Sequence, residues 1–403
     1  MKWFRWMAAG LLVTGLGVLS ACFNTTEVKI GVIIPQKGSS LEDYGFQISS
    51  GIEMALDDAR AKGELNKTYS LVRENEDLND IESVKAAFTR LVEKEGVSAV
   101  IGPASSAAMK ALVPMANEAK VTLLSPAASS PEINSGDVNS NDFIFRNQPS
   151  DTLEAQALSD VIFNKCRIQK LLMVRSRNTY AAGITYEMLR FARQNSDRIP
   201  GEVVKFSSNV DEADFVSVVD RIVELAPEGV FMGGYTDDIV PLIIEIRNRP
   251  ELANTYLFTS SSFLPEKVVT LVGQDAAEGI MFTTYPWAPS TMAPHIQDFA
   301  QRFKERFFVD PDNYAANGYD AGIILVHAIE KARHWMVDAV RDEMNGNNFD
   351  MTTTHNLILR ETDFNKRGDV TRIPSVYKVQ AGKVVKLTPE DMETIKTDIL
   401  TRI

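Results

Sequence analysis

The stretch VSAVIGPASSAAMKALVPM, residues 97–115, decides the fold. It reads as an apolar strand, a five-residue turn that carries two serines, and an apolar helix. Gly102 is the only glycine in the turn, which is too few for a phosphate cradle, and no lysine follows in the P-loop pattern. The turn is therefore expected to hold some other group, and the rest of the chain is needed to define it.

Short apolar strands alternate with amphipathic helices along both halves of the chain. The first series contains VKIGVII, YSLVR, VSAVI and VTLLS, and a second series after FIFRNQPSD contains KLLMV, EVVKF, GVFMG and TYLFT. Long helical patterns follow, and polar strands are expected near PSVYKVQAGKVVKL. Parallel strands need crossover connections and cover on both faces, so the pattern predicts two doubly wound α/β lobes, joined by more than one chain crossing.

The N-terminus has the pattern of an export signal. A short basic segment precedes an apolar run, Met7–Leu19, which is shorter than the roughly 20 residues that span a bilayer. Residues 19–22, Leu-Ser-Ala-Cys, resemble the lipobox of bacterial lipoproteins, in which the thiol carries lipid. We therefore expect a signal peptide at 1–21, a lipid-anchored linker at 22–27, and lipidation at Cys22. The mature protein would lie at the periplasmic face of a bacterial membrane.

Composition excludes several classes of function. The chain has 403 residues and a formal charge of −12, which argues against nucleic acid, since phosphates need a basic surface. The four histidines fall in no metal-ligand spacing, and no G-x-S-x-G elbow occurs. With Cys22 acylated, Cys166 would be left alone; the positive charges in FNKCRIQK could make it reactive, but a packed or partly exposed thiol is expected there. The sequence thus predicts no metal, no cofactor and no enzyme activity.

Two hydroxyl-rich turns are expected at one edge of the first sheet. In open parallel sheets, ligands sit beyond the carboxyl ends of the strands, near helix N-termini. Residues 102–106 occupy that position, and LLSPAASSPEIN, which begins at Leu123, places a second such turn one unit later. A serine in either turn could simply cap a helix. Two turns together favour a carboxylate held by hydroxyls and amides, with carbonyls left for a donor.

The order of these segments resembles a known family. The lipobox, GVIIP, YGFQISSGIEMALDD, VIGPASS, LLSPAASSPE, TYAAG, GVFMGGYTDD, AAEGIMFTTYP and YAANGYDAG resemble the type I periplasmic binding proteins of the branched-chain amino-acid transport group, over about Val28 to Leu387. The resemblance implies two Rossmann-like lobes that close on a small ligand by a hinge of three crossing strands. It also implies lobe boundaries at 28–146 plus 285–372 and at 147–284 plus 373–403.

The same resemblance implies which residues bind the ligand. Ser106, with Ser105 before it, would bind a carboxylate. The backbone carbonyl of Ala127 would accept from an ammonium group, and Ser129 would meet both ends of the ligand. Four tyrosines would line the pocket: Tyr44, Tyr180, Tyr235 and Tyr314. Any one of them could instead be an ordinary packed tyrosine with its hydroxyl paired.

One position departs from the family pattern. Amino-acid binders of this group place an acid just after the strand equivalent to TYLFT, to pair with the ligand ammonium, whereas this chain has Ser261 there. A buried ammonium without a counter-charge costs several kcal/mol. Asp237 or Asp238 could substitute, although both could equally be solvated acids at a helix start. Either the acid comes from a new position or the ligand has no ammonium group.

These observations predict a lipid-anchored solute-binding protein of an ABC importer. It would capture a small polar ligand by hinge closure: an amino acid, branched-chain or hydrophobic, or a related amide or carboxylate. Its partners would be that ligand, the permease, and the membrane through the N-terminal lipid, and the protein is expected to be a monomer. The alternative is a lipoprotein of similar fold that regulates a cell-wall synthase by protein contact.

Overall fold

The computed structural model describes most of the chain after residue 26. It covers 27–402 except for residues 37, 40, 135–141, 196–202, 208, 210–212, 286–291, 333–336, 346–356, 360–363 and 366. The expected signal peptide and Cys22 lie outside the described residues, so both stay predictions.

The first sheet is parallel throughout and has five strands in the order β2-β1-β3-β4-β5. All five residues of β1 from Ile30 to Ile34 are buried, as expected for a strand covered on both faces. The strands are β1 (Glu27–Ile34), β2 (Thr68–Asn75), β3 (Ala99–Ile101), β4 (Thr122–Ser125) and β5 (Ile144–Arg146).

The second sheet has seven strands in the order β12-β11-β10-β9-β8-β6-β7. Five of them are parallel: β6 (Leu171–Ser176), β7 (Val203–Phe206), β8 (Gly229–Gly233), β9 (Tyr256–Thr259) and β10 (Met281–Thr284). The last two form an antiparallel hairpin at one edge: β11 (Ser375–Gln380) and β12 (Lys383–Lys386). The hairpin confirms the expected polar strands, and the exposed lysines of β12 protect the sheet edge.

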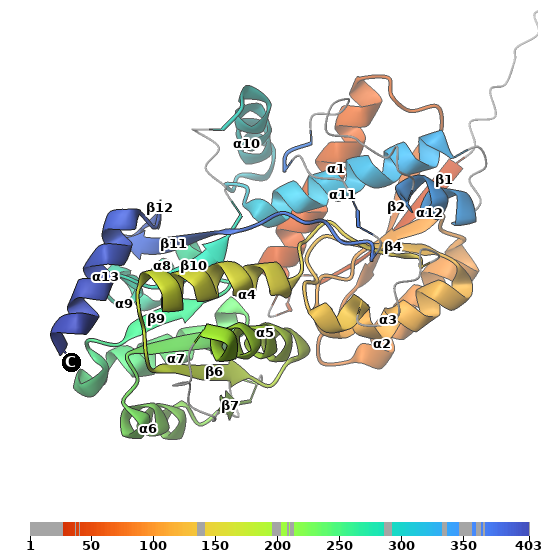
Figure 1. Cartoon of the computed structure of the whole chain (residues 1–403). Coiled ribbons are helices and arrows are strands. Elements are labelled where there is room, and N and C mark those ends of the chain that lie inside the picture. Colours follow the sequence, from red (N-terminus) through yellow and green to blue (C-terminus); the bar gives the residue numbers. More distant parts are fainter. Residues whose placement is uncertain are drawn as a thin grey trace, which may run out of the picture.

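Helices cover both faces of each sheet, as Figure 1 shows. In the first lobe, one core lies under α1 (Glu42–Ala61), α10 (Pro294–Phe307), α11 (Asn313–Lys331) and α12 (Val337–Asn345), and another lies under α2 (Ile81–Thr89) and α3 (Ser106–Ala119). In the second lobe, one core lies under α4 (Asp151–Ser159), α5 (Thr179–Asn195) and α13 (Pro389–Arg402). The other core lies under α6 (Phe215–Leu225), α7 (Thr236–Arg247), α8 (Pro265–Val272) and α9 (Gln274–Ala277). The doubly wound fold is therefore confirmed.

The chain passes between the two sheets three times. It leaves the first sheet after β5, returns after β10, and leaves again just before β11. The first and third crossings lie side by side, because the Arg146 N–H donates to Gly368 O at 2.8 Å and the Val370 N–H donates to Arg146 O at 3.3 Å. The predicted lobe boundaries themselves stay a prediction.

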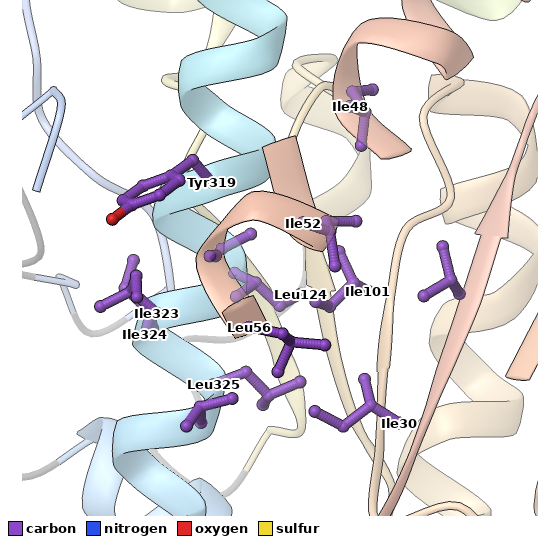
Figure 2. Close-up of a cluster of buried hydrophobic side chains, with 14 of the residues drawn as sticks. Ile30, Ile48, Ile52, Leu56, Ile101, Leu124, Tyr319, Ile323, Ile324 and Leu325 are labelled. Carbon is purple, nitrogen blue, oxygen red and sulfur yellow. The ribbon is translucent and has the colours of Figure 1, made fainter. Parts of the chain in front are cut away.

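Helices α1 and α11 pack backbone against backbone in the first lobe. Figure 2 shows side chains of both helices, among them Ile52 and Ile324, meeting over the strands of the sheet. The close approach depends on small residues, since a Cβ at Gly318 would lie 2.3 Å from Ile48 O and a Cβ at Gly51 would lie 2.1 Å from Ala315 O.

Replacing Gly318 with alanine is therefore expected to destabilise the protein by about 1–3 kcal/mol, because the clash involves backbone that cannot move aside. This loss should outweigh the roughly 1 kcal/mol that alanine gains over glycine in a helix. Thermal unfolding measures the change. Lys331→Ala, at an exposed position of the same helix, is the control and should leave the melting temperature nearly unchanged. A variant Gly318→Ala as stable as wild type would contradict this packing.

Candidate ligand-binding site

The turn after β3 has a fixed shape. Gly102 has a φ of 109°, and a Cβ there would lie 1.9 Å from Ile33 O, so only glycine fits. The fully buried carboxylate of Glu76 accepts hydrogen bonds from the N–H groups of Ala104 at 2.7 Å and Ser105 at 2.8 Å. Burial raises the pKa of Glu76, and these bonds oppose that rise. Two amides of the turn are thus engaged by the protein itself.

The turns after β3 and β4 are tied to each other. The Ser125 hydroxyl donates to Pro103 O at 2.6 Å and accepts from the Ala128 N–H at 2.9 Å. The Ser106 hydroxyl accepts from the Ser130 N–H at 3.2 Å. The two turns therefore form one rigid, hydroxyl-rich surface at the carboxyl edge of the sheet, as the sequence predicted.

Four tyrosine rings face this surface. Tyr180 and Tyr235 are stacked, with centroids 5.0 Å apart and planes at 18°. Tyr44 meets Tyr314 edge-on at 5.0 Å and Tyr235 at 6.2 Å. Such contacts stabilise aromatic pairs beyond their burial. The rings come from helices of both lobes and form one continuous aromatic wall.

Hydrogen bonds join the two lobes across the site. The Tyr44 hydroxyl on α1 donates to Ser262 O at 2.6 Å and lies 3.2 Å from Thr236 Oγ1. The Tyr314 hydroxyl on α11 donates to Ser261 O at 3.2 Å. The lobes are therefore closed on each other, and two tyrosines that line the site also hold it shut.

A cavity lies between the turns and the tyrosines. Its volume is about 20 Å³, which is room for about one water molecule. A larger guest requires the lobes or the rings to move. The lining residues are Leu41, Tyr44, Ala104, Ser106, Ala127, Ser129, Gln148, Tyr180, Tyr235, Ser261, Ser262 and Tyr314.

Most of the predicted ligand residues meet at this cavity. Eight line it: Tyr44, Ser106, Ala127, Ser129, Tyr180, Tyr235, Ser261 and Tyr314. Ser105 does not line it, because its hydroxyl caps α3 by accepting from the Ala108 N–H at 3.2 Å. Their roles in binding stay predictions, but the structure brings the eight together.

The two acids considered as ammonium partners do not line the cavity. Asp237 forms an ion pair with Lys267 at 2.8 Å. The Asp238 carboxylate accepts hydrogen bonds from the Ser176 hydroxyl at 2.9 Å and from Asn178 Nδ2 at 2.8 Å. Burial raises the pKa of Asp238 to about 6. Both carboxylates are engaged within the second lobe.

A different acid reaches the Ser261 position. The carboxylate of Glu154, on α4, accepts from both the N–H and the hydroxyl of Ser261, the latter at 2.9 Å, and from the Thr283 hydroxyl. Asp151 lies one turn earlier on the same helix, and both side chains are buried. Burial raises the pKa of each carboxyl. Sequence reasoning missed this pair, although two acids three residues apart at a helix start share one helix face.

Gln148 on the first crossing was also missed. Its Oε1 accepts a hydrogen bond from Asn317 Nδ2 at 2.7 Å, and Asn317 Nδ2 also donates to Pro126 O at 3.0 Å. Asn147 Nδ2 donates to Asn317 O at 2.8 Å. The crossing, α11 and the turn after β4 are therefore connected through one buried asparagine. The sequence signal was the polar run that follows the apolar segment FIF in FIFRNQPSD.

Other chemistry finds little support in the part of the chain that the structure describes. Cys166 is fully buried, and burial raises its pKa to about 12, so it is not a reactive thiol. Within the described ranges, no three side chains of His, Cys, Asp or Glu are grouped so that they could hold a metal. None of the helices described is both long and apolar enough to span a bilayer.

Comparisons with known proteins agree with the fold. The family described as "Periplasmic binding protein" matches residues 27–383. The Leu/Ile/Val-binding protein BraC3 of Rhizobium johnstonii is 23% identical over 361 residues, which is 89% of this chain and 93% of the relative. The name of this relative describes a binding protein.

Solved structures of similar fold carry different ligands. A branched-chain amino-acid transporter substrate-binding protein from Streptococcus pneumoniae, in complex with isoleucine, has a TM-score of 0.76 at 20% identity and covers 89% of this chain and 98% of its own. A solute-binding protein from Rhodopseudomonas palustris, in complex with 3,4-dihydroxybenzoic acid, has a TM-score of 0.70 at 17% identity and covers 90% and 96%. Similarity at this level shows a shared fold.

Proposed function

Because the chain belongs to the periplasmic binding protein family, we propose that it captures a small amino acid with an apolar side chain for an ABC importer. The observation that carries this proposal is the cavity between the lobes, where a hydroxyl-rich turn surface faces four tyrosines. The polar surface suits the carboxylate of a ligand, and the aromatic wall suits an apolar side chain. The branched-chain ligands of the relatives point to leucine, isoleucine or valine.

Capture would proceed by hinge closure. A ligand held by Ser106 and Ser129 from one lobe and by Tyr180 and Tyr235 from the other stabilises the closed state through contacts that the open state lacks. The present cavity is too small for leucine, so closure on a ligand would leave the rings of Tyr44 and Tyr314 farther from the opposite lobe. Related carboxylates or amides are the other ligand class that this site could take.

We further propose that Cys22 carries a lipid that tethers the protein at the periplasmic face, beside its permease, and that the protein acts as a monomer. The leader sequence supports the tether. Regulation of a cell-wall synthase by protein contact gains no support, because the site consists of buried side chains that face a closed cavity rather than an exposed surface.

Thermal shift of the purified protein tests the function. The panel comprises leucine, isoleucine, valine, threonine, alanine, acetamide, urea and 3,4-dihydroxybenzoate. A ligand at 100 times its Kd should add about 2.7 kcal/mol of stability. A branched-chain amino acid is expected to give the largest shift. If leucine, isoleucine and valine all leave the melting temperature unchanged, the proposed function is overturned.

Ser129→Ala tests the site. Removing a hydrogen bond to a charged ligand group should cost about 1.5–3 kcal/mol of binding free energy, measured by titration calorimetry with leucine. Ser105→Ala is the matched control, because Ser105 caps α3 without lining the cavity. It should lower stability by about 0.5–2 kcal/mol and leave the affinity unchanged. Equal affinity in wild type and Ser129→Ala would show that the polar end of the ligand lies elsewhere.

A further inference from the structure

Asp151 is a buried carboxylate without a hydrogen-bond partner. It is fully buried at the start of α4, and neither of its oxygens accepts a hydrogen bond of normal geometry from the residues that the structure describes, although the Ser129 hydroxyl is near enough to oppose the rise in its pKa. Its backbone N–H donates to Ser129 O at 2.9 Å, which fixes the residue directly behind the turn that lines the cavity. A buried carboxylate normally has partners, so this one calls for an explanation.

Other buried acids of the chain are satisfied by the protein. Glu76 accepts two backbone N–H groups, and Asp320 accepts two as well. Glu154, one turn along the helix from Asp151, accepts three donors from the Ser261 turn and β10. Glu154 is therefore committed to holding the Ser261 turn. Of the two acids, Asp151 is the one whose oxygens could accept hydrogen bonds from another group.

The surroundings of Asp151 favour a cation. The charges that act on its pKa are those of Glu154 on α4, Glu187 on α5 and Arg146, and Arg146 is engaged in an ion pair with Asp369 at 2.7 Å. Burial and the Glu154 charge raise the pKa of Asp151, while the Ser129 hydroxyl and Arg146 oppose the rise. A positive ligand group would favour the ionised form of Asp151 and so oppose this rise.

The aromatic wall adds to this field. The charge of Asp151 contributes to raising the pKa of Tyr180 and of Tyr235, the two stacked rings that line the cavity. Aromatic faces attract cations, and the attraction grows where water is excluded. The Asp151 carboxylate and the two tyrosine rings would therefore both attract a positive ligand group.

We propose that Asp151, which lies behind Ser129 and outside the lining of the present closed cavity, receives the ammonium group of the ligand once the lobes make room for it. This inference rests on the proposed function and names its specificity-determining acid. Ser261 then needs no acid side chain, because Glu154 stabilises that turn and Asp151 supplies the counter-charge from the first crossing. Asp237 and Asp238 are excluded by their own partners.

The test compares two probes that differ only in the ammonium group. Calorimetry with L-leucine and with 4-methylpentanoate, which lacks the amino group, is carried out on wild type, Asp151→Asn and Glu154→Gln. Asp151→Asn should weaken leucine binding on the order of 10- to 100-fold, as expected for loss of a charged hydrogen bond, and should bind 4-methylpentanoate at least as tightly as wild type does. Glu154→Gln removes the neighbouring charge and should reduce the preference for leucine less than Asp151→Asn does.

The outcomes separate the two proposals. If wild type binds leucine and Asp151→Asn retains the same preference for leucine over 4-methylpentanoate, the role of Asp151 is overturned while the proposed function stands. If wild type binds neither leucine, isoleucine nor valine, the proposed function fails, and this inference fails with it. Asp151→Ser, checked for folding by thermal unfolding, serves as a second variant should Asp151→Asn not fold. A greater loss of preference in Glu154→Gln would assign the ammonium to Glu154 instead.

Discussion

Replacing Arg146 with methionine is expected to lower the free energy of unfolding by about 3–5 kcal/mol. The side chain of Arg146 is 1% exposed, pairs with Asp369 at 2.7 Å, and donates to Ser130 O at 2.8 Å. The substitution removes the Arg146 guanidinium from the buried Asp369 carboxylate, and removal of one partner of a buried pair costs more than the pair itself contributes. The substitution should weaken the hinge in particular, since the pair joins the first and third crossings.

Urea unfolding measures this effect, and an exposed ion pair provides the control. Lys110 and Glu132 are about half exposed and 2.6 Å apart, so Lys110→Met should change the free energy of unfolding by at most about 1 kcal/mol. The double variant of Arg146→Met with Asp369→Leu should lose less than the sum of the two single variants, because it leaves no buried charge unpaired. Additive losses would mean that the two side chains act independently.

The fold was largely predictable because its signals are local. Short apolar segments such as Val97–Ile101, each followed by a helical pattern, are sufficient to indicate parallel strands with crossover helices. The hairpin of β11 and β12 was likewise visible as polar strands after the last long helix. The close contact of α1 with α11 was not predictable, since Gly51 and Gly318 reveal it only when the two helices are placed together.

The site was predictable where one residue carries its own signal. Serines in two turns after parallel strands, and tyrosines at the starts of helices, could be located along the sequence, and six of them meet at the cavity. Contacts between residues that are distant in the sequence could not be predicted. Ser105 and Ser106 look alike in the sequence, but only one faces the cavity, because the other caps α3. Asp151 and Glu154 resemble ordinary acids of a helix start until their burial is known.

The pH dependence of stability should reveal the buried Asp320. Its carboxylate accepts from the N–H groups of Ile358 and Leu359, both at 2.8 Å, yet burial raises its pKa to about 7. A pKa that is higher in the folded than in the unfolded state means that the group stabilises the fold fully below its unfolded pKa, near 3.8, and that this stabilisation is lost as pH rises toward 7. The loss amounts to as much as about 4 kcal/mol.

Asp320→Asn isolates this contribution. The stability of wild type relative to Asp320→Asn should be greatest near pH 4 and fall steadily until about pH 7, as measured by urea unfolding across that range. Asp391 provides a control of opposite sign, because Lys378 lowers its pKa to about 2. Its stabilisation is present above pH 3.8 and lost only as pH falls toward 2, so Asp391→Asn should show no slope between pH 4 and 7. A difference between wild type and Asp320→Asn that does not change with pH would mean that the two backbone N–H bonds keep Asp320 ionised despite its burial.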